Sequence, residues 1–148
     1  MKKILLINIF LIFIFSISNV NSKESIHFEK GLKYFNNHKF DKSKVFFERD
    51  LVFNPKSEHS YLYLAKIFNK EENIDEEEIN LKNVLMLNPQ NDEAIYMLAL
   101  IKIQQSDYNE AEKLINKFNL VCNSFCSKKS EIESKFKKLN PENAKSNN

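Results

Sequence analysis

Two cysteines, Cys122 and Cys126, are the residues of this chain whose types and spacing most directly suggest chemistry. On a helix, side chains at this spacing would have Cα atoms about 6 Å apart, near the upper end of the disulfide range, and a turn would bring them closer. In an oxidising compartment, an even number of cysteines favours a disulfide. The C-x3-C spacing differs from that of a thioredoxin-type pair, and no histidine is nearby. A local disulfide is therefore favoured over free thiols, and a redox or metal role has no support.

Other arrangements that could support catalysis are missing from the sequence. The single glycine, Gly31, excludes the glycine-rich phosphate loops and the nucleophile elbow, since those backbones need several glycines. The histidines are His27, His38 and His59, and none belongs to an H-E-x-x-H pair. The carboxylates fall in expected helix turns, without an apolar pocket that would raise a pKa. We therefore expect no enzymatic activity, no cofactor and no metal site.

The elements that must position these residues recur every 34 residues. Asn54-Pro55 and Asn88-Pro89 stand at this interval, and so do three pairs that begin an apolar-periodic run: Phe40-Asp41, Ile74-Asp75 and Tyr108-Asn109. A period of this length is typical of stacked helix–turn–helix units. With one glycine and no alternation of apolar and polar residues, the sequence predicts an all-α fold.

The ends of the second helix in each unit can be predicted from capping chemistry. Asp41, Asp75 and Asn109 stand just before an apolar-periodic run, where a side-chain oxygen can accept from free backbone N–H groups. Asp75 with Glu78, and Asn109 with Glu112, have the spacing of a capping box. The residue before a proline avoids the helical region, so the Asn-Pro pairs are expected to end these helices.

The repeated unit resembles the tetratricopeptide repeat, whose pattern is W-x2-L-G-x2-Y, then A-x3-F, then P. The motif positions of the first copy are held by His27, Lys30, Gly31, Tyr34, Ser43, Phe47 and Pro55. Those of the second are held by Tyr61, Leu64, Ala65, Phe68, Glu77, Leu81 and Pro89. Those of the third are held by Ile95, Leu98, Ala99, Lys102, Ala111, Ile115 and Asn123. The resemblance implies an α-solenoid of three repeats over residues 23–123, at about 24–57, 58–91 and 92–125.

Residues 126–148 are expected to close the solenoid. Ser130-x-x-Glu133 has capping-box spacing, and Ile132, Phe136 and Leu139 would form one apolar stripe of a short helix. The end of a solenoid exposes an apolar face unless a helix with a polar outer side covers it. We expect a capping helix here, followed by a polar tail.

The N-terminus has the anatomy of a secretory signal peptide. Lys2-Lys3 precede an apolar run over residues 4–15, and small and polar residues follow up to Ser22. A membrane span needs roughly 20 apolar residues, so this run is short for one. We expect residues 1–22 to be a signal peptide and Lys23 to begin the mature chain, which would be exported to the periplasm or cell envelope. The alternative is an uncleaved signal that anchors the chain in the inner membrane.

The charge balance argues against a nucleic-acid partner. The chain has 22 lysines and arginines against 20 acidic residues, and loss of Lys2 and Lys3 would leave no net charge. A nucleic-acid binder normally has a basic surplus. Acidic residues gather between Glu71 and Glu78. A solvated helix turn explains this cluster best, and a patch for a basic partner or a cation is the alternative.

A partner surface is predicted on the face of each first helix that lies opposite the motif residues, because the resemblance implies that this face lines a concave groove. Nine residues of this face are candidates for binding: Phe28, Leu32, Phe35, Leu62, Lys66, Asn69, Tyr96, Leu100 and Ile103. Most are apolar, which suits an amphipathic helix or a hydrophobic peptide. The sequence thus predicts a non-catalytic scaffold for a protein or peptide partner. The alternative is a structural subunit that forms a homo-oligomer through the same groove.

Overall fold

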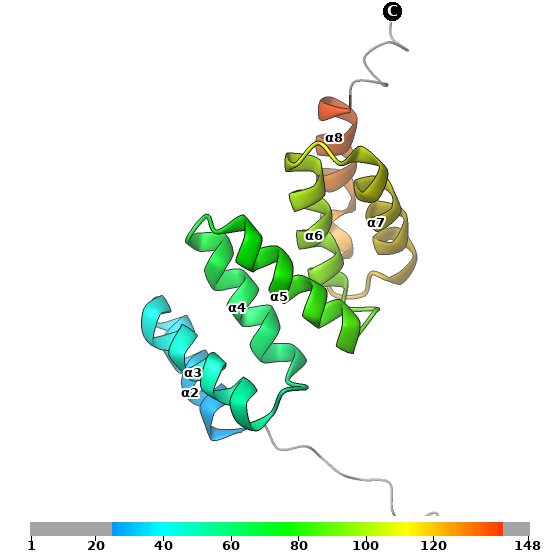
Figure 1. The fold of residues 1–148 in the computed structure, drawn as a ribbon. Coiled ribbons are helices and arrows are strands. Elements are labelled where there is room, and N and C mark those ends of the chain that lie inside the picture. The colour runs from blue at the N-terminus through cyan, green and yellow to red at the C-terminus, as the bar shows by residue number, and fades with distance from the viewer. Residues whose placement is uncertain (1–24, 141–148) are drawn as a thin grey trace, which may run out of the picture.

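The structure is a computed structural model that describes residues 25–140. Residues 1–22, with the predicted signal peptide and cleavage site, and the predicted tail after residue 140 lie outside the described residues. The helices are α2 (Ile26–Asn36), α3 (Phe40–Phe53), α4 (Glu58–Lys70), α5 (Ile74–Leu87), α6 (Asp92–Gln104), α7 (Tyr108–Val121), the 3-10 turn η1 (Cys126–Lys128) and α8 (Lys129–Leu139). They form three successive hairpins and a final helix (Figure 1). The predicted all-α solenoid of three repeats with a C-terminal helix is confirmed.

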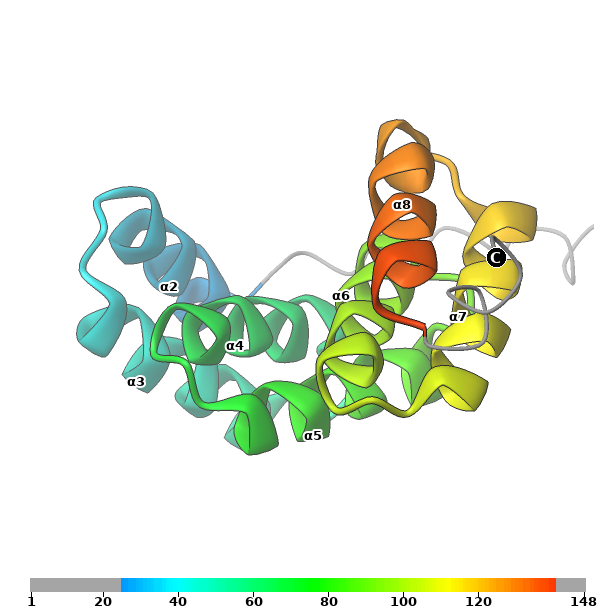
Figure 2. The same ribbon diagram turned by 90° about the horizontal axis from the view of Figure 1, so that it is seen from above.

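The three hairpins stack in two layers. Figure 2 shows α2 and α4 on one side of the stack and α3 and α5 on the other, with α6 and α7 continuing the row. Helix α8 stands beside α6 at the end of this row. Each first helix (α2, α4, α6) therefore contributes to a different surface from its second helix (α3, α5, α7).

The turn inside each hairpin has the same backbone geometry. His38, Glu72 and Ser106 stand 34 residues apart, and all three are left-handed, with φ of 56°, 56° and 61°. The next residue then returns its N–H to a carbonyl of the first helix, with Asn73 N–H donating to the Phe68 carbonyl at 2.9 Å. This is the Schellman arrangement that satisfies the carbonyls at a helix end. No glycine occupies any of these turns, although glycine adopts this conformation without steric cost.

The predicted caps of the second helices are wrong by two residues. Asn73 caps α5 by accepting from the Glu76 N–H at 3.3 Å, and Asp107 caps α7 by accepting from the Glu110 N–H at 3.2 Å. Helix α3 follows Lys39, which makes no side-chain cap. The predicted caps Asp41, Asp75 and Asn109 lie inside the helices. The left-handed residue just before each observed N-cap residue completes the turn. Each second helix therefore starts two residues earlier than the apolar periodicity suggested. Helix α8 likewise starts at Lys129, without the cap expected from Ser130.

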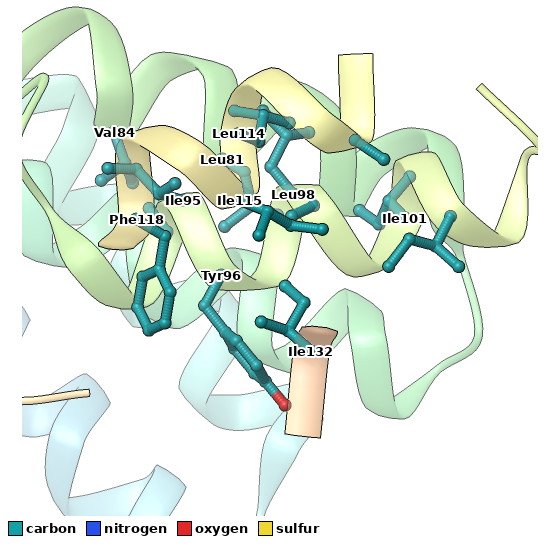
Figure 3. Packing of buried hydrophobic residues seen from close by; sticks show 14 of the residues in the cluster. Leu81, Val84, Ile95, Tyr96, Leu98, Ile101, Leu114, Ile115, Phe118 and Ile132 are labelled. Atoms are coloured by element: carbon teal, nitrogen blue, oxygen red, sulfur yellow. The ribbon is translucent and has the colours of Figure 1, made fainter. Parts of the chain in front are cut away.

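The hydrophobic core consists of two clusters. The larger one joins the second and third repeats and α8, and Figure 3 shows its members from α5, α6, α7 and α8. Ile132 of α8 is fully buried in this cluster, so α8 covers the end of the solenoid as predicted. The smaller cluster belongs to the first repeat and α4 and consists of Phe28, Phe47, Leu64 and Ile67.

A polar contact joins the first repeat to the second. Asp50 is fully buried in α3, and its carboxylate accepts from the hydroxyl of Ser60 in α4 and from the hydroxyl of Ser25. Ser25 also caps α2 by accepting from the Phe28 N–H at 3.2 Å. The positions equivalent to Asp50 in the later repeats hold Val84 and Phe118, both fully buried. The first boundary is therefore polar where the later copies are apolar.

Candidate binding groove

A cavity of about 860 Å³ opens along α4 and α6 and reaches α2 and α8. Six of the nine predicted partner-binding residues line it: Phe35, Lys66, Asn69, Tyr96, Leu100 and Ile103. They come from all three first helices, as expected for the face that a stack of hairpins turns inward. We call this cavity the groove.

The other three predicted residues, Phe28, Leu32 and Leu62, do not line the groove. Phe28 is 4% exposed and packs its ring 5.5 Å from that of Phe47. Leu62 is buried in the larger cluster, and Leu32 packs against the smaller one. Phe28 and Leu62 therefore pack inside the fold and do not contribute to the groove. A helical wheel separates the two sides of one helix, but it does not show where the next hairpin covers that side.

The floor of the groove is apolar. Tyr96, Leu100 and Ile103 of α6 contribute to it, with Phe125 from the link between α7 and α8. The Tyr96 hydroxyl donates to Glu131 of α8 at 2.8 Å (Figure 3 shows Tyr96 reaching toward the helix of Ile132). Burial, together with the hydrogen bond to the Glu131 carboxylate and its charge, raises the pKa of Tyr96 to about 12. The tyrosine therefore stays protonated and keeps α8 joined to α6.

The link between α7 and α8 is fixed at two points. A disulfide joins Cys122 and Cys126, whose Cα atoms lie 5.2 Å apart. The carboxylate of Asp92 accepts from the backbone N–H groups of Asn123, at 2.7 Å, and Phe125, at 2.8 Å. Burial would raise the pKa of Asp92, but these backbone hydrogen bonds lower it. The carboxylate therefore stays ionised and keeps Phe125 at the groove.

One wall of the groove is polar, and its charges are paired. Lys66 forms an ion pair with Glu93 at 2.8 Å. Asn69 donates from Nδ2 to both carboxylate oxygens of Glu77, each at 3.1 Å. Burial raises the pKa of Glu77, and the hydrogen bond from Asn69 offsets part of that rise. Glu77 stands at the motif position that alanine (Ala111) holds in the third copy, and Asn69 donates to its buried carboxylate.

The rim of the groove carries lysines that the sequence analysis missed. Lys70 of α4 and Lys135 and Lys138 of α8 line the cavity. Lys135 is paired with Glu131 at 3.4 Å, and Lys70 lies 5.3 Å from the centre of the Phe40 ring. Only the docking of α8 against α6 brings its lysines here. Helical periodicity in residues 129–139 could have predicted their common face, but not its position.

Two carboxylates of the acidic cluster between Glu71 and Glu78 are paired with lysines. Glu71 contacts Lys44 at 2.9 Å, and Glu78 contacts both Lys82 and Lys102 at 2.7 Å. Lys102, which departs from the repeat motif, is therefore held by this carboxylate. These pairs favour the interpretation of the cluster as ordinary helix turns.

Residues 25–140 contain neither a metal-binding cluster nor a membrane-spanning helix. Within this part of the chain, no group of His, Cys, Asp and Glu side chains is arranged to hold a metal ion. None of its helices combines the length and apolar character needed to cross a membrane.

No family model matches the sequence, and no curated protein matches it. Solved structures do match the fold. The Yersinia enterocolitica type III secretion chaperone SycD, in complex with a peptide of the translocator YopD, aligns with a TM-score of 0.70 at 12% identity, over 84% of this chain and 98% of that one. The first tetratricopeptide domain of Spaghetti, bound to an HSP90 peptide, aligns with a TM-score of 0.69 at 15% identity, over 82% and 98%. Pseudomonas aeruginosa PilF aligns with a TM-score of 0.61 at 16% identity, over 78% and 51%. With its 34-residue period, its three hairpins and these likenesses, the chain has the tetratricopeptide-repeat fold.

Proposed function

We propose that this chain is a non-catalytic scaffold that binds a protein or peptide partner in the groove. The observation that carries the proposal is the cavity of about 860 Å³ on the concave face, lined by side chains from α2, α4, α6 and α8. Concave, mostly apolar sites with a few polar groups are the usual form of a binding site. In this groove the carboxylates of Glu77 and Glu93 are already occupied by Asn69 and Lys66.

The chemistry of the groove favours one type of peptide. The apolar floor fits the apolar face of a short helix or of an extended peptide. Lys70 and Lys138 at the rim add positive charge, so acidic residues beside the apolar anchors would be favoured. Two similar folds are known with peptides bound, from YopD in SycD and from HSP90 in Spaghetti, which supports a peptide as the class of ligand.

Fluorescence polarisation with two labelled peptides would test this proposal. One is an amphipathic helical peptide with acidic residues next to leucine and phenylalanine anchors, and the other is a scrambled peptide of equal composition. Leu100→Glu should weaken binding of the first peptide at least about tenfold, because it places a charge in an apolar contact. Ile79→Glu, at an exposed apolar position of α5 outside the groove, is the matched control and should leave binding unchanged.

Equal affinity for both peptides, or equal losses in Leu100→Glu and Ile79→Glu, would contradict a binding role for the groove. Circular dichroism of each variant is needed alongside, since Leu100 is half-buried. A variant that binds poorly because it is unfolded would lose its helical signal.

The second candidate function is a structural subunit that forms a homo-oligomer through the same groove. The half-buried apolar side chain of Leu100 in the groove favours it, since accessible apolar surface also marks self-association. Light scattering after size exclusion distinguishes the two functions. A mass that rises with concentration, and returns to that of a monomer in Leu100→Glu, would support self-association. A monomer at all concentrations would support the scaffold.

We also propose that the protein works outside the cytoplasm, in the periplasm or cell envelope. The basic start and the apolar run over residues 4–15 support export. A disulfide between Cys122 and Cys126 is consistent with an oxidising compartment. Mass spectrometry of the protein from its native host should find a chain that begins near Lys23, or an intact chain in the membrane fraction if the signal is retained. Intact chain in the soluble cytosolic fraction would contradict export.

A further inference from the structure

Phe125 differs from the other groove residues in how the fold holds it. Of the described residues that line the groove, it alone lies outside a helix, in the link between α7 and α8. Its ring is half-buried, and the ring centre lies 5.9 Å from that of Tyr96. A side chain on a short link keeps its place only while the link does. The position of this ring therefore depends on what fixes the backbone around it.

Two hydrogen bonds and one covalent bond fix the backbone at Phe125. Its N–H donates to the Asp92 carboxylate at 2.8 Å, and its carbonyl accepts from the Lys128 N–H at 2.8 Å. The covalent bond is the disulfide between Cys122, which ends α7, and Cys126, the residue directly after Phe125. The hydrogen bonds can break and re-form as the link fluctuates, whereas the disulfide holds until a reductant reaches it.

Loss of the disulfide would act on the link before it acts on the helices. On the chain-entropy model, a bridge across residues 122–126 lowers the equilibrium constant for opening the link by up to about thirtyfold. The two helices beside the link keep other contacts. Ile132 of α8 is fully buried, and Asn119 of α7 donates to Glu133 of α8 at 2.9 Å. The link can therefore loosen while α7 and α8 stay packed together.

We propose that the Cys122–Cys126 disulfide sets the affinity of the groove through Phe125. The oxidised chain holds the ring in the floor of the groove, where it contacts an apolar anchor of the partner, and reduction releases the ring. This inference rests on the proposed peptide-binding function of the groove. A fixed aromatic ring supplies a large contact area at a small entropic cost. After reduction, binding must first order the link again, and this cost lowers the affinity.

The reductant is a dithiol, of the class found in thiol–disulfide oxidoreductases. Cys126 is exposed and Cys122 is half-buried, so the attack falls on Sγ of Cys126. One thiolate of the dithiol forms a mixed disulfide with Cys126, and the electron pair of the broken S–S bond leaves on Cys122, which takes up a proton. The second thiol then closes the disulfide of the reductant and releases Cys126 as a thiol. Two electrons and two protons pass from the dithiol to the chain.

Fluorescence polarisation under oxidising and reducing conditions tests the proposal. The probe is the labelled amphipathic peptide with acidic residues, made without cysteine, and the reductant is dithiothreitol. Reduction of the full chain should weaken binding about threefold to tenfold. Phe125→Ala should weaken binding in the oxidised chain and show no further loss on reduction, because the side chain through which the disulfide acts is absent.

Two further variants serve as controls. Phe53→Ala removes an exposed phenylalanine at the end of α3, outside the groove, and should keep both the affinity and its response to reduction. The double variant Cys122→Ser/Cys126→Ser should bind like the reduced chain with or without dithiothreitol. A response of this double variant to dithiothreitol would show that the reagent acts on the peptide and would overturn the proposal.

A second measurement needs no peptide. The chain has no tryptophan, so Phe125→Trp places a single reporter in the link. Reduction should shift its emission to the red as the ring moves into water. Phe53→Trp, on α3, should show no shift. Unchanged emission of Phe125→Trp on reduction would overturn the positioning of this side chain by the disulfide.

The results distinguish failure of this inference from failure of the proposed function. A chain that binds the peptide equally well in both redox states would overturn the inference alone. So would a loss on reduction that is as large in Phe125→Ala as in the unchanged chain, because the disulfide would then act through the fold as a whole. A chain that binds no peptide in either state would overturn the proposed function, and this inference with it.

Discussion

Gly31 faces Phe47 so closely that a Cβ on Gly31 would lie 2.6 Å from Cε1 of the phenylalanine ring. Phe47 is fully buried in the first cluster, so the ring has little room to move. The equivalent pairs in the later repeats are Ala65 with Leu81 and Ala99 with Ile115. The first hairpin therefore combines a larger side chain on the second helix with no side chain on the first.

This pair predicts a compensating double substitution. Gly31→Ala alone should cost about 1–3 kcal/mol through overpacking. Phe47→Leu alone should also destabilise, by removing buried atoms. Together they recreate the pair of the second repeat, so the double variant should be more stable than the sum predicts by about 1 kcal/mol or more. Urea unfolding of the four proteins measures this, and strictly additive losses would show that the two side chains do not compete for space.

The buried carboxylate of Asp50 should be costly to remove by itself. Asp50→Val leaves the Ser60 hydroxyl without its acceptor in a fully buried position, at a cost of about 2 kcal/mol. Adding Ser60→Ala removes the unpaired hydroxyl and recreates the Val84 and Ala94 types of the next boundary, so most of the loss should be recovered. The free energy of unfolding from urea titration measures both effects. A double variant as unstable as Asp50→Val would contradict the proposed compensation.

The left-handed turn at Glu72 is open to stabilisation by glycine. A residue with a Cβ is disfavoured at φ of 56°, so Glu72→Gly should raise the free energy of unfolding by roughly 0.5 kcal/mol or more. Asp75→Gly, three residues later in the first turn of α5, is the control and should lower it by roughly 0.5 kcal/mol, through the poorer helix propensity of glycine and the loss of a carboxylate at the helix N-terminus. Thermal denaturation of both variants would show the opposite signs. Destabilisation by Glu72→Gly would mean that the glutamate makes a contact worth more than the backbone strain.

Glu77 and Glu78 should respond to pH in opposite directions. Burial would raise the pKa of Glu78, but hydrogen bonds from Lys102, Lys82 and Gln105 lower it to about 2. Its contribution to stability is thus present above the unfolded pKa of about 4.5 and is lost as the pH falls toward 2. The pKa of Glu77 is raised, so its ionised form destabilises the fold at neutral pH, and this penalty disappears as the pH falls through the folded pKa.

Glutamine substitutions separate the two effects. At pH 7, Glu78→Gln should lower the melting temperature, and Glu77→Gln should raise it, since the amide removes a partly desolvated charge. Between pH 7 and pH 3, Glu77→Gln should lose its advantage, and Glu78→Gln should lose part of its disadvantage, the rest of which remains until the pH nears 2. Melting curves over this pH range are the measurement, and equal shifts of the two variants at every pH would contradict the assignment.

The disulfide should protect both thiols and stabilise the link. Alkylation of the native protein should leave Cys122 and Cys126 unmodified until a reductant is added, although Cys126 is exposed. Reduction should lower the free energy of unfolding by about 2 kcal/mol, because the bridge closes a short loop. Mass spectrometry counts the alkylated thiols, and urea titration with and without reductant gives the change in stability. Immediate reaction of both thiols would contradict the bridge.

The sequence by itself determined the architecture of this protein. Copies of one pattern at 34-residue spacing fix the lengths of the hairpins, and small residues at Gly31, Ala65 and Ala99 allow their helices to approach closely. The Asn-Pro pairs were correctly predicted to end α3 and α5, because the residue before proline is excluded from the helical region. These features are local, so they depend on neighbours in the chain and can be found without the fold.

The tertiary structure decided which residues of a predicted face remain accessible. Phe28 and Tyr96 occupy equivalent positions of the repeat, yet only Tyr96 lines the groove, because the rings of Phe47 and Tyr63 enclose Phe28. Lys138 reaches the groove only because α8 packs on α6, and no periodic pattern specifies that docking. The exposure of Val52, Met86 and Leu120 was likewise decided by packing, since the helical period places them in a row but does not say whether another element covers it. Periodicity fixes the direction of a side chain from its own helix, whereas burial depends on contacts between segments that are distant in sequence.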